Sequence, residues 1–71
     1  DLILEAGDGR VVGIEVKATA SVTARDTRHL ATLRDKLGSR FASGLLLHTG
    51  RTAAPFGDRI AAIPLDILWN A

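Results

Sequence analysis

The sequence has 71 residues, a net charge of +1 and an apolar fraction of 46%. The length suits one small domain over residues 1–71, and the apolar fraction excludes a disordered chain. The absence of cysteine excludes disulfides and thiolate metal sites and fits a cytoplasmic protein. No apolar run is long enough to span a membrane. The net charge alone does not predict nucleic-acid binding.

The first two predicted strands form a β-hairpin. Alternating apolar and polar residues predict strands at 1–5 and 11–18, and the Gly-Asp-Gly sequence at 7–9 is typical of a tight turn. Glu15 and Lys17 alternate with apolar residues, so both leave the same face of the second strand. A carboxylate and an ammonium group on one rigid strand are well placed for chemistry.

The length of the hairpin loop decides which residues face each other. A three-residue loop at 7–9 places Asp1 opposite Glu15, whereas a two-residue turn slips the pairing by one and places Asp1 opposite Val16. We favour the three-residue loop because it gathers apolar residues on one face. The residues that we expect on this buried face are Leu2, Leu4, Val12, Ile14 and Val16.

A helix is predicted at 24–37. Thr23 and Asp26 resemble a capping box at its start, and Gly38 is typical of a helix end. The apolar stripe that should pack on the sheet consists of Leu30, Leu33 and Leu37.

Two more strands are predicted after the helix. The first covers 42–48, where an unbroken apolar run predicts burial on both faces, with Leu45 and Leu47 deeply buried. A right-handed crossover would make this strand parallel to the second strand. A loop at 50–58 and a short strand at 60–63 follow.

Asp1, Glu15 and Lys17 are the candidates for chemistry. Two facing carboxylates suit Mg²⁺, and a neighbouring lysine could orient a water or stabilise charge developing on phosphorus, as in a phosphodiesterase. The alternative interpretation is that Glu15 and Lys17 are solvated residues on the open face of a strand.

The order of features resembles the PD-(D/E)XK, or restriction-endonuclease-like, nuclease superfamily. These features are an acid, a hairpin, the sequence Ile-Glu-Val-Lys-Ala at 14–18, a helix and a further strand. More closely, the whole chain resembles the C-terminal domain of unknown function of a group of prokaryotic AAA-family ATPases. The blocks that carry this resemblance are Asp1–Glu5, Gly13–Ala18, Leu33–Gly38, Gly44–Gly50, Pro55–Ile60 and Ala62–Trp69.

The resemblance implies an α/β fold that is a partial restriction-endonuclease-like fold, with a mixed sheet, a β-hairpin, a crossover helix and a parallel strand. It implies that Asp1 and Glu15 ligate Mg²⁺, that Lys17 is the catalytic lysine and that DNA is the substrate. The alternative is an inactive domain of the same fold that docks a partner or substrate.

The sequence begins inside a predicted strand and without methionine, so we expect it to be a piece of a longer protein. The upstream helix and strand of the fold and the ATPase domain are absent from it. We expect contacts with the remainder of its own ATPase chain, or a homo-oligomer formed through the exposed sheet edge.

Other candidate residues carry weaker signals. Arg25, Arg28 and Arg34 are predicted mainly as a solvated helix face and, as the alternative, as contacts to nucleic-acid phosphates. His29 and His48 have no partner at metal-ligand spacing, so we expect neither to bind a metal.

Overall fold

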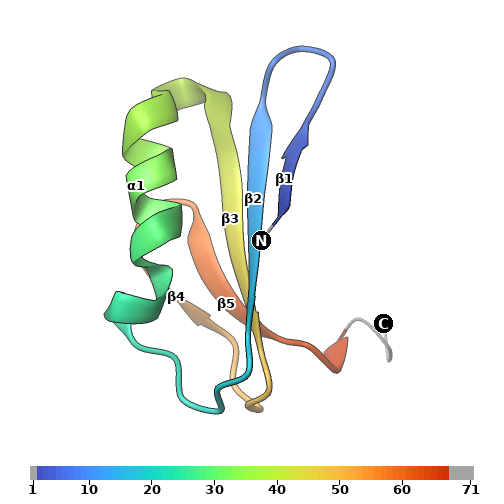
Figure 1. Ribbon diagram of the computed structural model, residues 1–71, viewed down its shortest axis with the longest axis vertical. Helices are drawn as coiled ribbons and strands as arrows, with labels where there is room; N and C mark the ends of the chain where they lie inside the picture. The colour runs from blue at the N-terminus through green and yellow to red at the C-terminus, as the bar shows by residue number, and fades with distance from the viewer. Residues whose placement is uncertain (1, 68–71) are drawn as a thin grey trace.

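The computed structural model describes residues 2–67, which form an α/β fold with a five-stranded mixed sheet and one α-helix (Figure 1). The elements are β1 (Leu2–Glu5), β2 (Val11–Lys17), the 3-10 turn η1 (Ala24–Thr27), α1 (Arg28–Leu37), the 3-10 turn η2 (Gly38–Arg40), β3 (Phe41–His48), β4 (Ala54–Pro55) and β5 (Ile60–Pro64). The strand order is β1-β2-β3-β5-β4.

The hairpin has the register that the three-residue loop predicts. Leu4 of β1 pairs with Val12 of β2, and the backbone N–H of Ala6 donates to the carbonyl of Arg10 at 2.8 Å. Gly9 adopts a φ of 88°, a left-handed conformation that glycine takes without strain. The predicted pairing of Asp1 with Glu15 involves a residue outside the described range.

The crossover from β2 to β3 is also as predicted. The capping box of Thr23 and Asp26 starts the helical segment, although its first turn is the 3-10 turn η1 and the α-helix proper begins at Arg28. Gly38 ends α1 with a φ of 58°. The strand β3 then runs parallel to β2, as the crossover requires.

β3 lies at the centre of the sheet and pairs in parallel with both β2 and β5. The prediction for its side chains was partly wrong: Leu47 is buried as expected, whereas Leu45, which points to the same side of the sheet, is only half-buried. Leu45 lies beside the small Ala61 of β5, while Leu47 lies beside Ile63. The short edge strand β4 lies inside the predicted loop. Its two residues end in Pro55, which lacks the N–H that a longer ladder would need.

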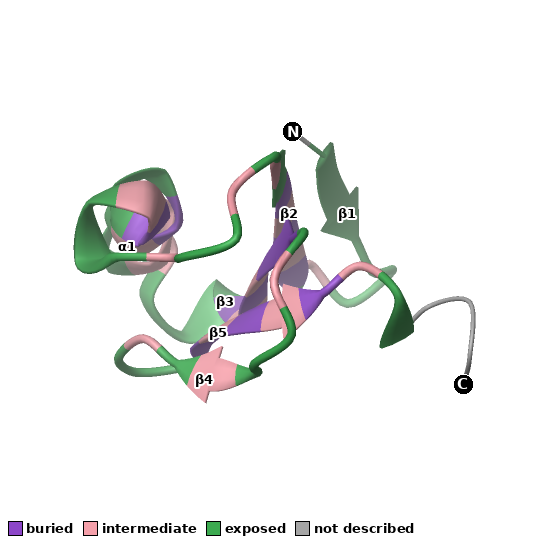
Figure 2. Ribbon diagram, turned by 90° about the horizontal axis from the view of Figure 1, so that it is seen from below, coloured by how far each residue is buried: buried purple, intermediate pink, exposed green. Residues whose placement is uncertain are grey.

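The helix covers the sheet face opposite to the one that the sequence predicted. In β2 the buried residues are Val11, Gly13 and Glu15, whereas the alternate residues are half-buried or exposed, with Val16 55% exposed. The prediction that Leu2, Leu4, Val12, Ile14 and Val16 share the buried face is therefore wrong. Figure 2 shows α1 on one side of the sheet only.

Glycines explain why the helix chooses this face. Gly13 and Gly44 are paired across β2 and β3, and the helix packs directly above them. A Cβ atom on Gly13 would lie 3.1 Å from the side chains of Leu30 and Leu33. Because these glycines have no side chains, the leucines of α1 pack closely on the sheet, in a core with Phe41, Leu46 and Ile60.

The uncovered face of the sheet is apolar. The register places on it Leu2, Leu4, Val12, Ile14, Val16, Ser43, Leu45, Leu47, Ala61 and Ile63, of which Ser43 is polar and Leu47 is buried. Two of them, Leu2 and Leu4, are 52% and 49% exposed. Parallel strands are ordinarily covered on both faces, so this surface has the composition of an interface.

Candidate functional site

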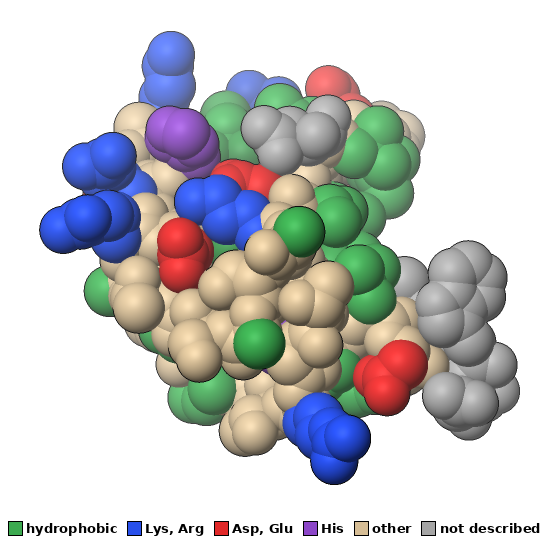
Figure 3. Space-filling model, turned by 60° about the horizontal axis from the view of Figure 1, so that its bottom comes forward, with side chains coloured by type: hydrophobic (Ala, Val, Ile, Leu, Met, Phe, Trp, Pro, Cys, Tyr) green, Lys and Arg blue, Asp and Glu red, His purple; other side chains and the backbone are tan. Residues whose placement is uncertain are grey.

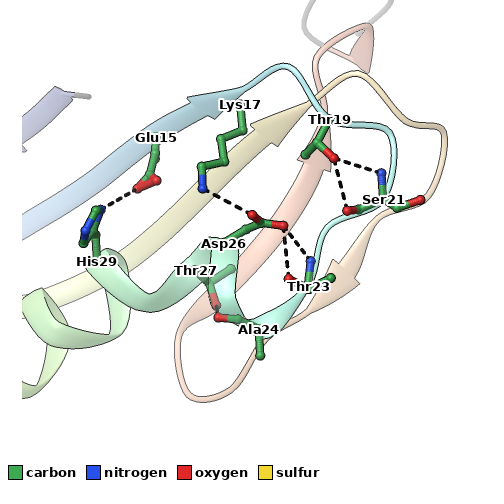
Figure 4. A network of polar contacts seen from close by, with 9 residues as sticks. All are labelled: Glu15, Lys17, Thr19, Ser21, Thr23, Ala24, Asp26, Thr27 and His29. Carbon is green, nitrogen blue, oxygen red and sulfur yellow. Dashed lines mark hydrogen bonds and ion pairs between the residues drawn. The ribbon is translucent and has the colours of Figure 1, made fainter.

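Glu15 and Lys17 lie on the helix-covered face of β2 and point toward the start of the helical segment (Figure 4). Glu15 is 5% exposed, so it is not the solvated residue that the alternative interpretation expected. Its backbone pairs with Leu46 of β3, which fixes its position in the sheet. Burial of a carboxylate is costly unless it is paired or binds a metal.

Lys17 forms an ion pair with the helical segment. Its Nζ donates to Oδ1 of Asp26 at 3.2 Å, across the gap between β2 and η1. Oδ2 of Asp26 accepts from the backbone N–H of Thr23 at 2.8 Å, which completes the capping box. The hydrogen bond from the Thr23 backbone, followed by that from Lys17, lowers the pKa of Asp26.

Glu15 has a helical neighbour of its own. Nδ1 of His29 lies 3.9 Å from Oε1 of Glu15, and the imidazole is 80% exposed. Neither Asp26 nor His29 was predicted from the sequence to lie in the site. Their spacing could have indicated that they act together, because residues three apart on a helix lie on the same face.

A hollow of about 190 Å³ opens beside Glu15, between β1 and α1. Ile3, Glu15, His29, Leu30 and Leu33 contribute to its walls, which are mainly apolar. Figure 3 shows acidic side chains next to Lys or Arg side chains and a histidine on this part of the surface, with hydrophobic side chains beside them. The buried carboxylate is therefore reachable from outside.

The donor set for a metal is incomplete within the described residues. Among residues 2–67 there is no group of three His, Cys, Asp or Glu side chains that could hold an ion. Glu15 fits as one hard oxygen ligand, of the kind that Mg²⁺ prefers. The second predicted ligand, Asp1, lies outside the described residues.

The three predicted arginines are not equivalent. Arg25 and Arg28 are exposed near the start of the helix. The side chain of Arg34 is only 19% exposed, pairs with Asp35 at 3.0 Å and donates to the carbonyl of Asp58 at 3.2 Å. Arg34 therefore serves the packing of α1 on the loop before β5, whereas Arg25 and Arg28 have the exposure that a phosphate contact requires.

His48 is held by the backbone at the end of β3. It is buried, its Nδ1 accepts from the N–H of Gly50 at 3.0 Å, and its Nε2 lies 3.1 Å from the carbonyl of Thr52. Both ring nitrogens are thus engaged in organising the turn, a structural role.

A model of the family described as "Domain of unknown function (DUF4143)" matches residues 1–68. The chain belongs to this family. No curated protein and no solved structure gave a significant match to this DUF4143 domain. In the part of the domain that the structure describes, no helix combines the length and the apolar character needed to cross a membrane.

Proposed function

We propose that this domain is a PD-(D/E)XK-type nuclease domain that hydrolyses DNA phosphodiester bonds with Mg²⁺, at the C-terminus of a cytoplasmic prokaryotic AAA-type ATPase. The observation that carries the proposal is Glu15. The Glu15 side chain is 7% exposed, borders an open hollow and, within residues 2–67, has one ion-pair contact, at 3.9 Å. A buried carboxylate with spare acceptor capacity is suited to a cation.

The proposed roles follow from the chemistry of each side chain. Glu15 and Asp1 would hold the metal, which when bound lowers the pKa of an attacking water and neutralises phosphate charge. Lys17 would stabilise negative charge developing on the phosphate oxygens. Arg25 and Arg28 would contact neighbouring phosphates, which would bring the substrate to a domain of small net charge.

The test uses the full-length protein and Mg²⁺-dependent cleavage of DNA. Glu15→Ala and Lys17→Ala should each abolish cleavage. Glu5→Ala and Lys36→Ala, which remove an exposed carboxylate and an exposed ammonium elsewhere, are the matched controls and should cleave like the parent. A parent that never cleaves, or site variants that cleave as well as it does, would refute the proposal.

A second candidate is an inactive domain of the same fold that docks a partner. The apolar open face favours it, since Leu2, Leu4 and Val16 are each about half exposed. The partner would be the rest of its own ATPase chain, or a second copy joined through β1, whose residues are exposed at the sheet edge. For this candidate, Glu15→Ala would leave the function of the full-length protein intact and Val16→Asp would impair it.

A further inference from the structure

The carboxylate of Asp26 joins two parts of the molecule. Oδ2 accepts hydrogen bonds from the backbone N–H of Thr23 at 2.8 Å and from its hydroxyl at 3.3 Å. Oδ1 accepts from Nζ of Lys17 at 3.2 Å. One side chain therefore caps the helical segment and also holds the ammonium group of β2 (Figure 4).

The carboxylate that holds Lys17 is itself held in place. Asp26 lies in η1, directly before Thr27, which is buried and donates its hydroxyl to the carbonyl of Ala24 at 3.0 Å. The backbone N–H of Thr23 fixes the other oxygen of Asp26 at 2.8 Å, so the carboxylate keeps its orientation without the Thr23 side chain. Preorganised groups of this kind are what a reactive side chain needs around it.

Lys17 needs such a partner more than Glu15 does. Its side chain is 43% exposed, against 7% for Glu15, so packing alone leaves it free to move. A lysine has a long flexible stem, and a free ammonium samples many positions. The ion pair with Asp26 keeps Nζ on the helix side of β2, the side that also carries the Glu15 carboxylate.

A capping role alone does not explain the contact with Lys17. The capping box needs an acceptor for the N–H of Thr23, and Oδ2 provides it. The capping box does not need Oδ1 of Asp26, which faces Lys17 of β2 rather than solvent. The Asp26 side chain is only 21% exposed. A direct metal-ligand role is a poor fit as well, because both oxygens already accept hydrogen bonds.

We infer that Asp26 is a positioning residue, which fixes the ammonium group of Lys17 next to the reacting phosphate through its Oδ1 while its Oδ2 caps the helix. The inference rests on the proposed function, in which Lys17 acts on that phosphate. In this arrangement Lys17 contributes a fixed positive charge, and Asp26 acts only through it.

The test uses the full-length protein and compares Asp26→Asn with Asp26→Glu and Thr23→Ala. Asp26→Asn keeps an oxygen for the cap but loses the charge that holds Lys17, so kcat for DNA cleavage should fall while KM stays constant. The loss should approach about a hundredfold, the effect of misplacing a reacting group by about 1 Å. Asp26→Glu should recover part of the rate.

Thr23→Ala is the control for the cap. It removes the hydroxyl contact at 3.3 Å and leaves the contact between Asp26 and Lys17, so it should lower the melting temperature and preserve kcat. If Thr23→Ala loses as much activity as Asp26→Asn, Asp26 is only a cap. If Asp26→Asn cleaves at the parental rate, the positioning role is likewise refuted.

A second readout separates this inference from the proposed function. An amine-acylating reagent followed by mass spectrometry measures how accessible Lys17 is, with exposed Lys36 as the internal reference. Lys17 should be protected in the parent and in Thr23→Ala and lose that protection in Asp26→Asn. A parent that does not cleave refutes the nuclease proposal, while equal labelling of Lys17 in parent and Asp26→Asn refutes the fixing of Lys17 by Asp26.

Discussion

At the scale of single residues, the site consists of side chains that share one face of β2 and one turn of helix. Glu15 and Lys17 were predictable because side chains alternate along a strand. The contacts of Asp26 and His29 with these two residues could not be predicted, because they depend on where the helical segment lies over the sheet. The local capping signal of Asp26 is visible in the sequence, but its contact with Lys17 is not.

The carboxylate of Asp26 should make stability depend on pH in the acid range. Its pKa is lowered below the ordinary value of 3.8 by the Thr23 backbone and by Lys17. Because the pKa is lower in the folded state, the ionised carboxylate stabilises the fold fully at pH values above the ordinary pKa of 3.8. This stabilisation is lost as the pH falls through the lower, folded-state pKa. The parent should therefore be more stable than Asp26→Asn at neutral pH, and the two should converge in acid.

Urea denaturation at a series of pH values from neutral to below 3.8 measures this difference. A gap between parent and Asp26→Asn that stays constant over the whole range would show that the ionised carboxylate does not stabilise the fold. A gap that closes on acidification is the expected result.

Gly44 should not tolerate even a methyl group. A Cβ atom there would lie 2.8 Å from the ring of Phe41 and 3.3 Å from Ile60, beneath the helix. Overpacking of this kind costs about 1–3 kcal/mol, so Gly44→Ala should lower the free energy of unfolding by that amount. Gly7→Ala is the matched control because nothing lies within 4 Å of its Cβ position, and equal stability of the two variants would contradict the packing account.

At the scale of elements, local signals predicted most of the architecture. The Gly-Asp-Gly loop sets the register of the hairpin, the Thr23–Asp26 capping box starts the helical segment, and Gly38 ends it. The parallel pairing of β2 with β3 follows from the strand–helix–strand connection, which returns the chain to the same end of the sheet. These features depend on residues close together in the sequence.

The covered face of the sheet could not be predicted in the same way. One face of β2 is uniformly apolar, and hydrophobic pattern alone favoured burying it. The helix instead packs where Gly13 meets Gly44, which requires knowing the register between two distant strands. The edge strand β4 was missed because two residues ending in Pro55 carry no strand periodicity.

The helix should contribute much of the stability through one leucine. Leu30 is 4% exposed and packs in the cluster of Phe41, Leu46 and Ile60. Leu30→Ala should cost about 2–5 kcal/mol, the range for a buried leucine. Ala substitution of Leu2, which is 52% exposed, should cost much less in the isolated domain, and a similar cost for both would contradict this description of the core.

In the molecule as a whole, α1 covers one face of the sheet. No helix within residues 2–67 covers the other face, which is apolar. A small domain of this length buries little surface, so the open face matters for its stability. We expect the rest of a longer chain, or a partner, to cover it.

Val16→Asp tests this expectation by comparing two contexts. In the isolated domain Val16 is 55% exposed, so the carboxylate should cost little. In the full-length protein the same change would bury a charge and lower the melting temperature clearly. Thr32→Asp, at an exposed position on α1, is the control, and equal effects of Val16→Asp in both contexts would indicate that the face stays exposed.

We propose that Glu15 binds a divalent cation, and Fe²⁺-directed cleavage of the polypeptide can locate that cation. Iron bound in place of Mg²⁺ generates hydroxyl radicals with ascorbate and peroxide, which cut the backbone near the metal. The full-length protein should be cut next to Glu15, excess Mg²⁺ should suppress that cut, and Glu15→Ala should remove it while Glu5→Ala keeps it. The absence of a cut near Glu15, or an unchanged cut in Glu15→Ala, would contradict the account.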